Sequence, residues 1–499
     1  MRNKSQKYPK FNAEIEEIKK NGITTDLIQK IIDKHRANAE YNRELYERYQ
    51  CLEEGVPIFS RKPRFGDSDS VINNKINNDF FSEICDFKIG YFAGVPISYS
   101  YSMTEESKED TDTDATSVIE QEQAVKAASK ALTDFTTLNG MADKDMEMTK
   151  YAAVCGYAGR LLYHDPDGNE RVMITKPFES IILSETENIA EPTFSIRYYE
   201  HEKLDGSTVQ RVEYYDAKQI RFFEGYGMSM VEYQPPIPNL FGYCPLQGIP
   251  NNEELLGDAE KVIAAIDAYD KAISDGMNDT EAFANAYLVY ENVNISDEEI
   301  AKGQATGSIQ FYTGGANGKV YFLTKDVNDT FVSNNLQRLE KNIYRFSKTP
   351  NLNDETFNSA SGISLKFKLT SLEAKCGMFE AKVTAAGVYM FKLLANAWSK
   401  KQIAIDPLQV AMEYKRNFPL DMLSEAQTAQ ALIAAGLPKR IAYQLAISGI
   451  DDVDYVMQLI EEEKDSIPSL FANIPEDEEP TEEEKTVVQP TQDDETTEE

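Results

Sequence analysis

Side chains that commonly carry catalytic chemistry are few in this sequence, and their spacing groups none of them. The 499 residues include three histidines, His35, His164 and His201, and none forms a recognisable pair with a cysteine or serine nucleophile. Glycine-rich phosphate loops ending in Lys-Ser or Lys-Thr, HExxH zinc motifs and GxSxG turns do not occur. We therefore predict that the protein is not an enzyme and uses no cofactor. A catalytic carboxylate pair among its many acidic residues is the alternative to a solvated acidic surface.

The cysteines and the acidic turns predict no metal centre. A calcium loop would need a third oxygen ligand and a distal glutamate, which residues 164–169 do not place correctly. Pro166 and Gly168 favour a tight turn there instead. Five cysteines occur without a CxxC spacing, which is typical of reduced thiols in a cytosolic protein. They are Cys51, Cys85, Cys155, Cys244 and Cys376.

Four basic residues have the spacing of one helical face. Arg338, Lys341, Arg345 and Lys348 recur at i, i+3, i+7 and i+10. In an acidic chain these cations need a partner, and two interpretations stay open. They either pair with acids on the preceding helix of the same or a neighbouring subunit, or form basic rings that face DNA in a channel. The acidic candidates are Asp258, Asp267 and Asp270.

The negative net charge of the chain limits the kinds of partner that it can bind. The formal net charge is −33, and residues 476–499 supply 12 acidic residues and one lysine. A protein that holds DNA tightly replaces counterions with Lys and Arg, so we expect no static DNA complex, although DNA can pass through. The apolar run 383–398 is too short for a membrane span and contains Lys392, so the chain is expected to be soluble and intracellular. From residue 467 onward the composition predicts disorder.

The N-terminal half predicts a helix followed by hairpins. Thr25 is expected to cap the helix, and we interpret His35 on its apolar stripe as a packed residue. Residues 103–117 predict an exposed loop, residues 159–225 alternate around Asp-Gly turns as hairpins do, and residues 235–238 are expected to close this part. The apolar stripe consists of Ile28, Ile32, His35 and Ala39.

The centre of the chain predicts two helices that flank a small mixed segment. Apolar residues recur with a helical period on both sides, and strand-like runs with a glycine-rich turn lie between them. The expected order is a helix at 252–276, a strand at 286–290, a short helix at 296–299, a hairpin of 308–313 and 319–323 around 314–318, and a helix at 329–348.

A longer helix and several short ones follow. The helix expected at 363–400 would be about 60 Å long, and Gly377 and Gly387 predict kinks in it. Residues 419–465 predict short helices, one of which begins with a capping box. The capping residues are Ser424 and Gln427.

A polar loop, residues 350–362, precedes the long helix. Its side chains are mostly short hydrogen-bonding groups, and Ser361-Gly362 supplies a flexible joint before the helix. Such groups can touch phosphate through neutral, reversible contacts. The polar residues are Asn351, Asn353, Asp354, Glu355, Asn358 and Ser359.

Two stretches resemble the portal proteins of tailed siphophages of Gram-positive bacteria, the SPP1-like portal family. One is the polar loop and the start of the long helix, with Pro350, Phe357, Ser361-Gly362, Leu365-Lys366-Phe367-Lys368 and Leu372-Glu373. The other includes Asn73-Asn74-Lys75-Ile76-Asn77-Asn78 and continues to Tyr99. The resemblance covers most of residues 25–465 in order.

This resemblance implies an α+β subunit of the portal type. The expected parts are an N-terminal wing with a helical start and a hairpin-rich β part at 1–250, a stem helix at 251–279, a small α/β clip at 280–328, a second stem helix at 329–349, a tunnel loop at 350–362, a kinked spine helix with further wing at 363–417, a helical crown at 418–465 and a disordered acidic tail at 466–499.

The resemblance also implies a ring, a dodecamer in this family, at one capsid vertex of the virion, assembled in the host cytoplasm. Its partners would be double-stranded DNA in transit, the terminase large subunit, the head–tail connector protein, and the major capsid and scaffolding proteins, with no membrane. The tunnel-loop residues Asn351, Asn353, Asp354, Glu355, Asn358 and Ser359 would face DNA in the channel. The rival interpretation is a minor head or enzyme-associated capsid protein that forms no ring.

Overall fold

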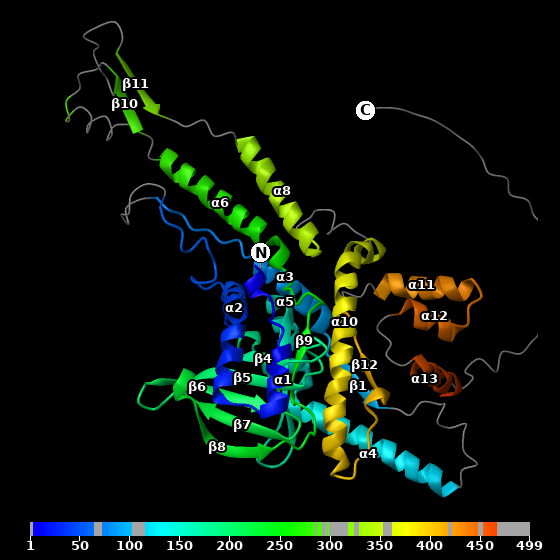
Figure 1. Cartoon of the computed structure of the whole chain (residues 1–499). Coiled ribbons are helices and arrows are strands. Elements are labelled where there is room, and N and C mark those ends of the chain that lie inside the picture. The colour runs from blue at the N-terminus through cyan, green and yellow to red at the C-terminus, as the bar shows by residue number, and fades with distance from the viewer. Residues whose placement is uncertain are drawn as a thin grey trace, which may run out of the picture. The chain divides into compact units, whose positions relative to one another are not determined.

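The chain combines helices with antiparallel sheets, which confirms the predicted α+β class (Figure 1). Contacts divide it into two units, residues 1–418 and 419–499. The computed structural model describes residues 3–63, 72–101, 115–284, 287–291, 296, 298, 318–323, 329–352, 362–417, 422–447 and 453–466.

Helices dominate the first part of the larger unit. The stripe on α2 is buried as expected, and burial lowers the pKa of His35 to about 3. The cap of α2 differs from the prediction, because the Thr24 hydroxyl accepts from the Leu27 amide at 3.3 Å and Thr25 is already helical. The 103–117 loop lies largely outside the described residues. The elements are η1 (Lys4–Gln6), α1 (Asn12–Asn21), α2 (Thr25–Tyr49), α3 (Phe80–Ala93), α4 (Ala115–Asn139) and α5 (Met141–Cys155).

A five-stranded antiparallel sheet has the order β4-β5-β6-β7-β8. Alternate residues of its strands, such as Ile196 and Val212, pack with α1 and α2 in one core. The proline-rich residues 235–238 belong to the edge strand β8, where the missing amide donors are tolerated. The elements are η3 (Pro177–Glu179), β4 (Ser180–Leu183), β5 (Phe194–Glu202), β6 (Thr208–Tyr215), β7 (Gln219–Glu224), η4 (Gly227–Ser229) and β8 (Val231–Pro238).

A second sheet, β3-β2-β9, joins β2 (Tyr157–His164), β3 (Glu170–Thr175) and β9 (Leu246–Pro250). The turn between β2 and β3 is the tight turn predicted from its composition. The Asp165 carboxylate accepts from the amides of Asp167 and Asn169 at 3.0 and 2.9 Å, so this carboxylate stabilises the turn itself.

Helices α6 (Ile263–Ala284) and α8 (Asp329–Ser347) pack side by side (Figure 1). The helix expected from residue 252 begins later, at η5 (Glu260–Val262). Leu255 has a left-handed backbone, with φ of 55°, and the Asn252 side chain accepts from the Leu256 amide at 2.9 Å, so residues 252–256 form a turn. Strand β11 (Lys319–Leu323) pairs with β10 (Tyr287–Glu291), whereas its expected partner at 308–313 lies outside the described residues.

The longest helix is α10 (Gly362–Ser399), which packs in the largest apolar core of the unit. An added Cβ at Gly387 would lie 2.4 Å from the Met412 sulfur, so the Met412 side chain would have to move to admit a larger residue there. The expected kinks stay predictions. After η6 (Pro407–Gln409), strand β12 (Val410–Glu413) pairs with β1 (Ser98–Tyr101).

The smaller unit contains α11 (Met422–Ala434), α12 (Lys439–Ala446) and α13 (Val453–Ser466). The expected capping box is wrong, because α11 begins at Met422 and Ser424 is already inside the helix. Gly436, with φ of 93°, and Pro438 separate α11 from α12 as predicted. The tail from residue 467 lies outside the described residues.

Candidate functional site

The structure locates the beginning of the polar loop. The Asn351 side chain donates to the Glu340 carboxylate on α8 at 3.0 Å, which fastens this end of the loop to the helix. The other predicted loop residues, Asn353, Asp354, Glu355, Asn358 and Ser359, lie outside the described residues.

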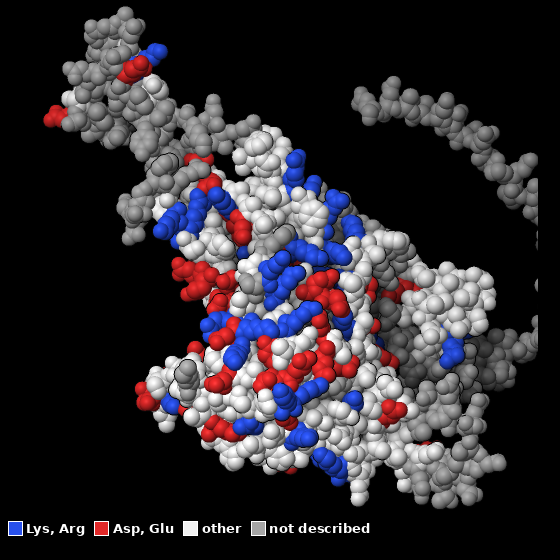
Figure 2. Space-filling view, in the orientation of Figure 1, with Lys and Arg blue, Asp and Glu red and all other residues white. Residues whose placement is uncertain are grey.

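The predicted basic residues of α8 are exposed. We define the basic face as Arg338, Lys341 and Arg345, which lie on the helix, whereas Lys348 follows the helix end in a left-handed conformation with φ of 62°. Within the described part of the chain, no carboxylate forms an ion pair with any of these four side chains. Figure 2 shows blue Lys and Arg side chains in the region of α8. The basic face is therefore available to an external partner.

The acidic partners expected within the same subunit are engaged elsewhere, so that part of the interpretation is wrong. Each acid lies on the side of its segment that meets the N-terminal helices or α10, where basic and amide groups satisfy it. The partners are Lys88 and Lys375 for Asp258, Arg48 for Asp267, and the amide and side chain of Asn78 for Asp270.

A buried charged group, which we call the Asp258 cluster, comprises Lys88, Asn251, Asp258 and Lys375. The two ammonium groups lie 3.0 and 2.9 Å from the Asp258 carboxylate, and Lys88 also donates to the Asn251 side chain. Lys375 further donates to the Ser347 carbonyl at the end of α8, at 3.0 Å. Burial opposes ionisation, yet the two lysines hold the pKa of Asp258 below its usual value. This cluster was not predicted from the sequence; the residue that could have indicated it is the lysine within the apolar helix 80–93.

A second buried contact lies at the middle of α10. The Ala386 carbonyl accepts from the Arg160 guanidinium at 2.8 Å and from the Gln247 amide at 3.1 Å. Both donors come from the β3-β2-β9 sheet and are fully buried. Two side chains from the sheet thus fix the helix beside Gly387.

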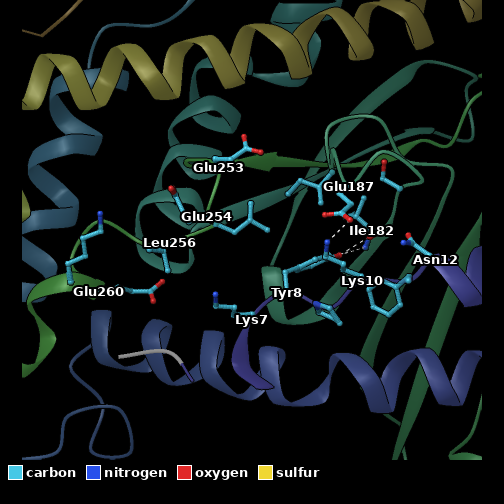
Figure 3. Close-up of a pocket in the computed structure, with 16 residues that line it drawn as sticks. Lys7, Tyr8, Lys10, Asn12, Ile182, Glu187, Glu253, Glu254, Leu256 and Glu260 are labelled. Carbon is cyan, nitrogen blue, oxygen red and sulfur yellow. Dashed lines mark hydrogen bonds and ion pairs between the residues drawn. The ribbon is translucent and has the colours of Figure 1, made fainter. Parts of the chain in front are cut away.

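A cavity of about 500 Å³ lies between the N-terminal residues 7–12 and the turn before α6 (Figure 3). The Tyr8 hydroxyl donates to the Ile182 carbonyl at 3.0 Å and accepts from its amide at 2.6 Å, and burial raises the pKa of Tyr8. Lys10 pairs with Glu187 at 2.6 Å. These contacts hold the N-terminal segment on β4, so we assign the polar groups a structural role.

No group of three or more His, Cys, Asp or Glu side chains in the described ranges is arranged to hold a metal ion. None of the described helices combines the length and apolar character needed to cross a membrane.

Comparisons with known proteins show similarity to phage portal proteins over most of the chain. The family model of phage portal proteins, SPP1 Gp6-like, matches residues 28–469, which extend from α2 through α13. The chain is 21% identical over 396 residues to the portal protein of Bacillus phage SPP1, covering 74% of this chain and 71% of that protein. It is 23% identical over 441 residues to the portal protein of Clostridium phage phiCD119, covering 84% and 90%.

Proposed function

Because this chain belongs to the SPP1 Gp6-like family of phage portal proteins, we propose that its copies form a ring at one vertex of the phage capsid. The observation that carries the proposal is the family match over residues 28–469. Exposed apolar side chains on paired helices support it, namely Phe331 and Phe346 on α8 and Met277 on α6. Neighbouring subunits in a closed ring would cover such residues. We take twelve subunits as the expected number by resemblance to the family.

The ring would be the conduit for DNA during packaging and ejection. The net charge of −33 per subunit would repel DNA from most surfaces and so limit adhesion during transit. The polar loop, fastened at Asn351 to α8, would reach the DNA with Asn353, Asp354, Glu355, Asn358 and Ser359. Neutral side chains in this loop would contact phosphate reversibly.

The remaining roles follow from a position at the vertex. The segment between α6 and α8, which includes β10 and β11, would dock the terminase large subunit and later the head–tail connector protein. The rest of the ring would contact the major capsid and scaffolding proteins. The protein would assemble in the host cytoplasm and remain in the virion, with a structural and not a catalytic role.

The rival function is a minor head protein that forms no ring. Mass photometry of the purified full chain at micromolar concentration separates the two, since a ring would have about twelve times the 56.3 kDa subunit mass. Negative-stain images would show the central opening. A monodisperse monomer would contradict the portal function and favour the rival.

A further inference from the structure

Helix α2 carries an acidic face that matches the basic face of α8. We define the acidic face as Glu40, Glu44 and Glu47, which recur at i, i+4 and i+7 on the solvent side of the helix. Within the residues that the structure describes, none of these three carboxylates forms an ion pair. Burial and repulsion from Glu47 and Glu40 raise the pKa of Glu44, so the face would gain from nearby cations.

The two faces lie on different sides of α6. Arg48 of α2 pairs with Asp267 of α6, and Tyr41 of α2 donates to Glu260 just before α6 at 3.2 Å. Helix α8 packs on α6 from another direction, so α2 and α8 lie on either side of α6 in Figure 1. Figure 2 shows red side chains at the edge beside α2 and blue side chains over α8 near the opposite edge. A single subunit thus presents opposite charges on two separate surfaces.

The spacing of the two faces is the same when the helices run antiparallel. The basic face has intervals of three and four residues from Arg338 to Arg345, and the acidic face has the same intervals from Glu47 back to Glu40. Both faces therefore extend about 10 Å along their helices, at a rise of about 1.5 Å per residue. In this register Lys341 lies opposite Glu44.

We propose that the basic face of α8 in one subunit docks on the acidic face of α2 in the neighbouring subunit. The proposal rests on the ring proposed above and identifies one contact that builds it. Two different surfaces that complement each other make a head-to-tail contact, and repetition of such a contact closes a ring when the rotation permits. The partner of the basic face is then a second copy of this chain and not DNA.

Physical chemistry defines what this contact would contribute. Exposed ion pairs add little free energy one by one, so their main effect is to set the register of neighbours and to speed association. Because the charges remain near solvent, added salt weakens the attraction between the two faces. Wild-type ring assembly should therefore weaken as salt is added, whereas in a variant with like charges on the two faces added salt should screen the repulsion and favour assembly.

The test reverses charge on each face and then on both. One variant carries Lys341→Glu and Arg345→Glu, the second carries Glu40→Lys and Glu44→Lys, and the third combines all four changes. Lys126 and Lys130 of α4 offer a matched control, since they are exposed, four residues apart and form no ion pair with a described residue. Mass photometry across a series of NaCl concentrations would give the ring fraction, and circular dichroism would verify folding of each variant.

We expect each two-residue reversal to raise the apparent dissociation constant at least tenfold, the combined variant to recover most of the wild-type ring fraction, and the α4 control to match wild type. If both charge-reversal variants form rings to the same extent as wild type, with or without altered DNA packaging, this contact is overturned but the proposed ring is not. Loss of rings without recovery in the combined variant would also overturn it. A monomeric wild-type protein would instead overturn the proposed function.

Disulfide trapping provides a second measurement that does not depend on charge reversal. The double variant Lys341→Cys with Glu44→Cys should form disulfide-linked oligomers on mild oxidation, whereas either single variant should not. Four native cysteines are buried, and the partly exposed Cys51 is controlled by the single variants. Absence of linked oligomers in rings of the double variant would overturn the proposed register.

Discussion

Lys88 and Asp258 form an ion pair of 3.0 Å in which each side chain is 1% exposed. Lys375 of α10 binds the other oxygen of the same carboxylate at 2.9 Å and also binds the Ser347 carbonyl where α8 ends. One buried carboxylate therefore connects α3, α10 and the segment that leads into α6, and Lys375 extends the connection to α8.

Loss of the central carboxylate should be costly. Asp258→Asn keeps the size of the side chain but leaves Lys88 buried without a counterion. We expect the free energy of unfolding to fall by about 3–5 kcal/mol, the range seen when one partner of a buried ion pair is removed. Urea denaturation of the full chain followed by circular dichroism would measure this change.

Glu253 offers a matched control on the same segment. It pairs with Lys382 of α10 at 2.6 Å, but its side chain is 83% exposed. Glu253→Gln should change the free energy of unfolding by less than about 1 kcal/mol, because exposed pairs contribute little. Equal changes in the free energy of unfolding for the two substitutions would show that burial does not determine how much the Asp258 cluster contributes to stability.

Patterns in the sequence predicted those features of the fold that depend on residues close together in the chain. The stripe that contains His35 predicted the buried side of α2, since helical periodicity is a local property. The start of α6 was predicted too early because the left-handed backbone of Leu255 leaves no mark in the apolar pattern. The cap of α2 moved by one residue because Thr24 and Thr25 are equally suited by type.

The candidate site was less predictable than the fold. The spacing from Arg338 to Arg345 correctly indicated one exposed helical face, but the three acids named as candidate partners are engaged by other residues of the same subunit. Asp258 forms an ion pair with Lys88, a residue far away in the sequence, and no local pattern reveals such a pairing. Most of the polar loop lies outside the described residues, so its role stays a prediction.

Acid should weaken the contact between α10 and the β2–β3 turn through Glu170. Burial disfavours the charged Glu170 carboxylate, but its contacts with His164 and Lys401 outweigh this and lower its pKa to about 2. Lys401 lies 2.7 Å from this carboxylate, and the Trp398 ring nitrogen donates to it at 3.3 Å. A lowered pKa stabilises the folded state at pH values above the unfolded pKa of about 4.3, and this stabilisation is lost as the pH falls toward 2.

The corresponding variant is Glu170→Gln. At pH 7 we expect it to be less stable than wild type by about 1.5–3 kcal/mol, the contribution of hydrogen bonds to a charged group. The difference should shrink as the pH falls from about 4.5 to about 3, because wild type loses its charge advantage there. Urea midpoints at several pH values would measure this, and a difference that does not change with pH would contradict the role of the charge.

Two glycines of α10 should respond to alanine in opposite directions. No atom lies within 4 Å of an added Cβ at Gly377, so Gly377→Ala should stabilise the helix by about 0.5–1 kcal/mol. At Gly387 the added Cβ would meet the Met412 sulfur at 2.4 Å, and we expect Gly387→Ala to cost about 1–3 kcal/mol.

Urea denaturation would give both values, and Met412→Ala supplies the control. Combined with Gly387→Ala, it makes room for the added methyl, so the cost of the two changes should be less than the sum of the single costs. Destabilisation by Gly377→Ala would support a kink at that position, since a straight helix gives no reason for it.

Shortening the polar loop tests the proposed conduit most directly. Replacing residues 352–358 by a few glycines would remove Asn353, Asp354, Glu355 and Asn358 while retaining the Asn351 contact with Glu340. Rings should form normally and dock the packaging motor, because α8 and α10 remain intact on either side. DNA translocation or retention should fall, since the lost side chains are the ones proposed to contact DNA. The measurement is the nuclease-protected DNA per capsid assembled with variant rings.

A deletion of residues 476–499 serves as the control for that experiment. This segment holds 12 acidic residues and one lysine and lies beyond the last described helix, so its removal should leave capsid filling unchanged. If the loop variant fills and retains DNA as wild type does, residues 352–358 are only a connector between α8 and α10. The proposal that this loop contacts DNA would then be wrong, whereas the proposal of a ring is tested separately by mass photometry.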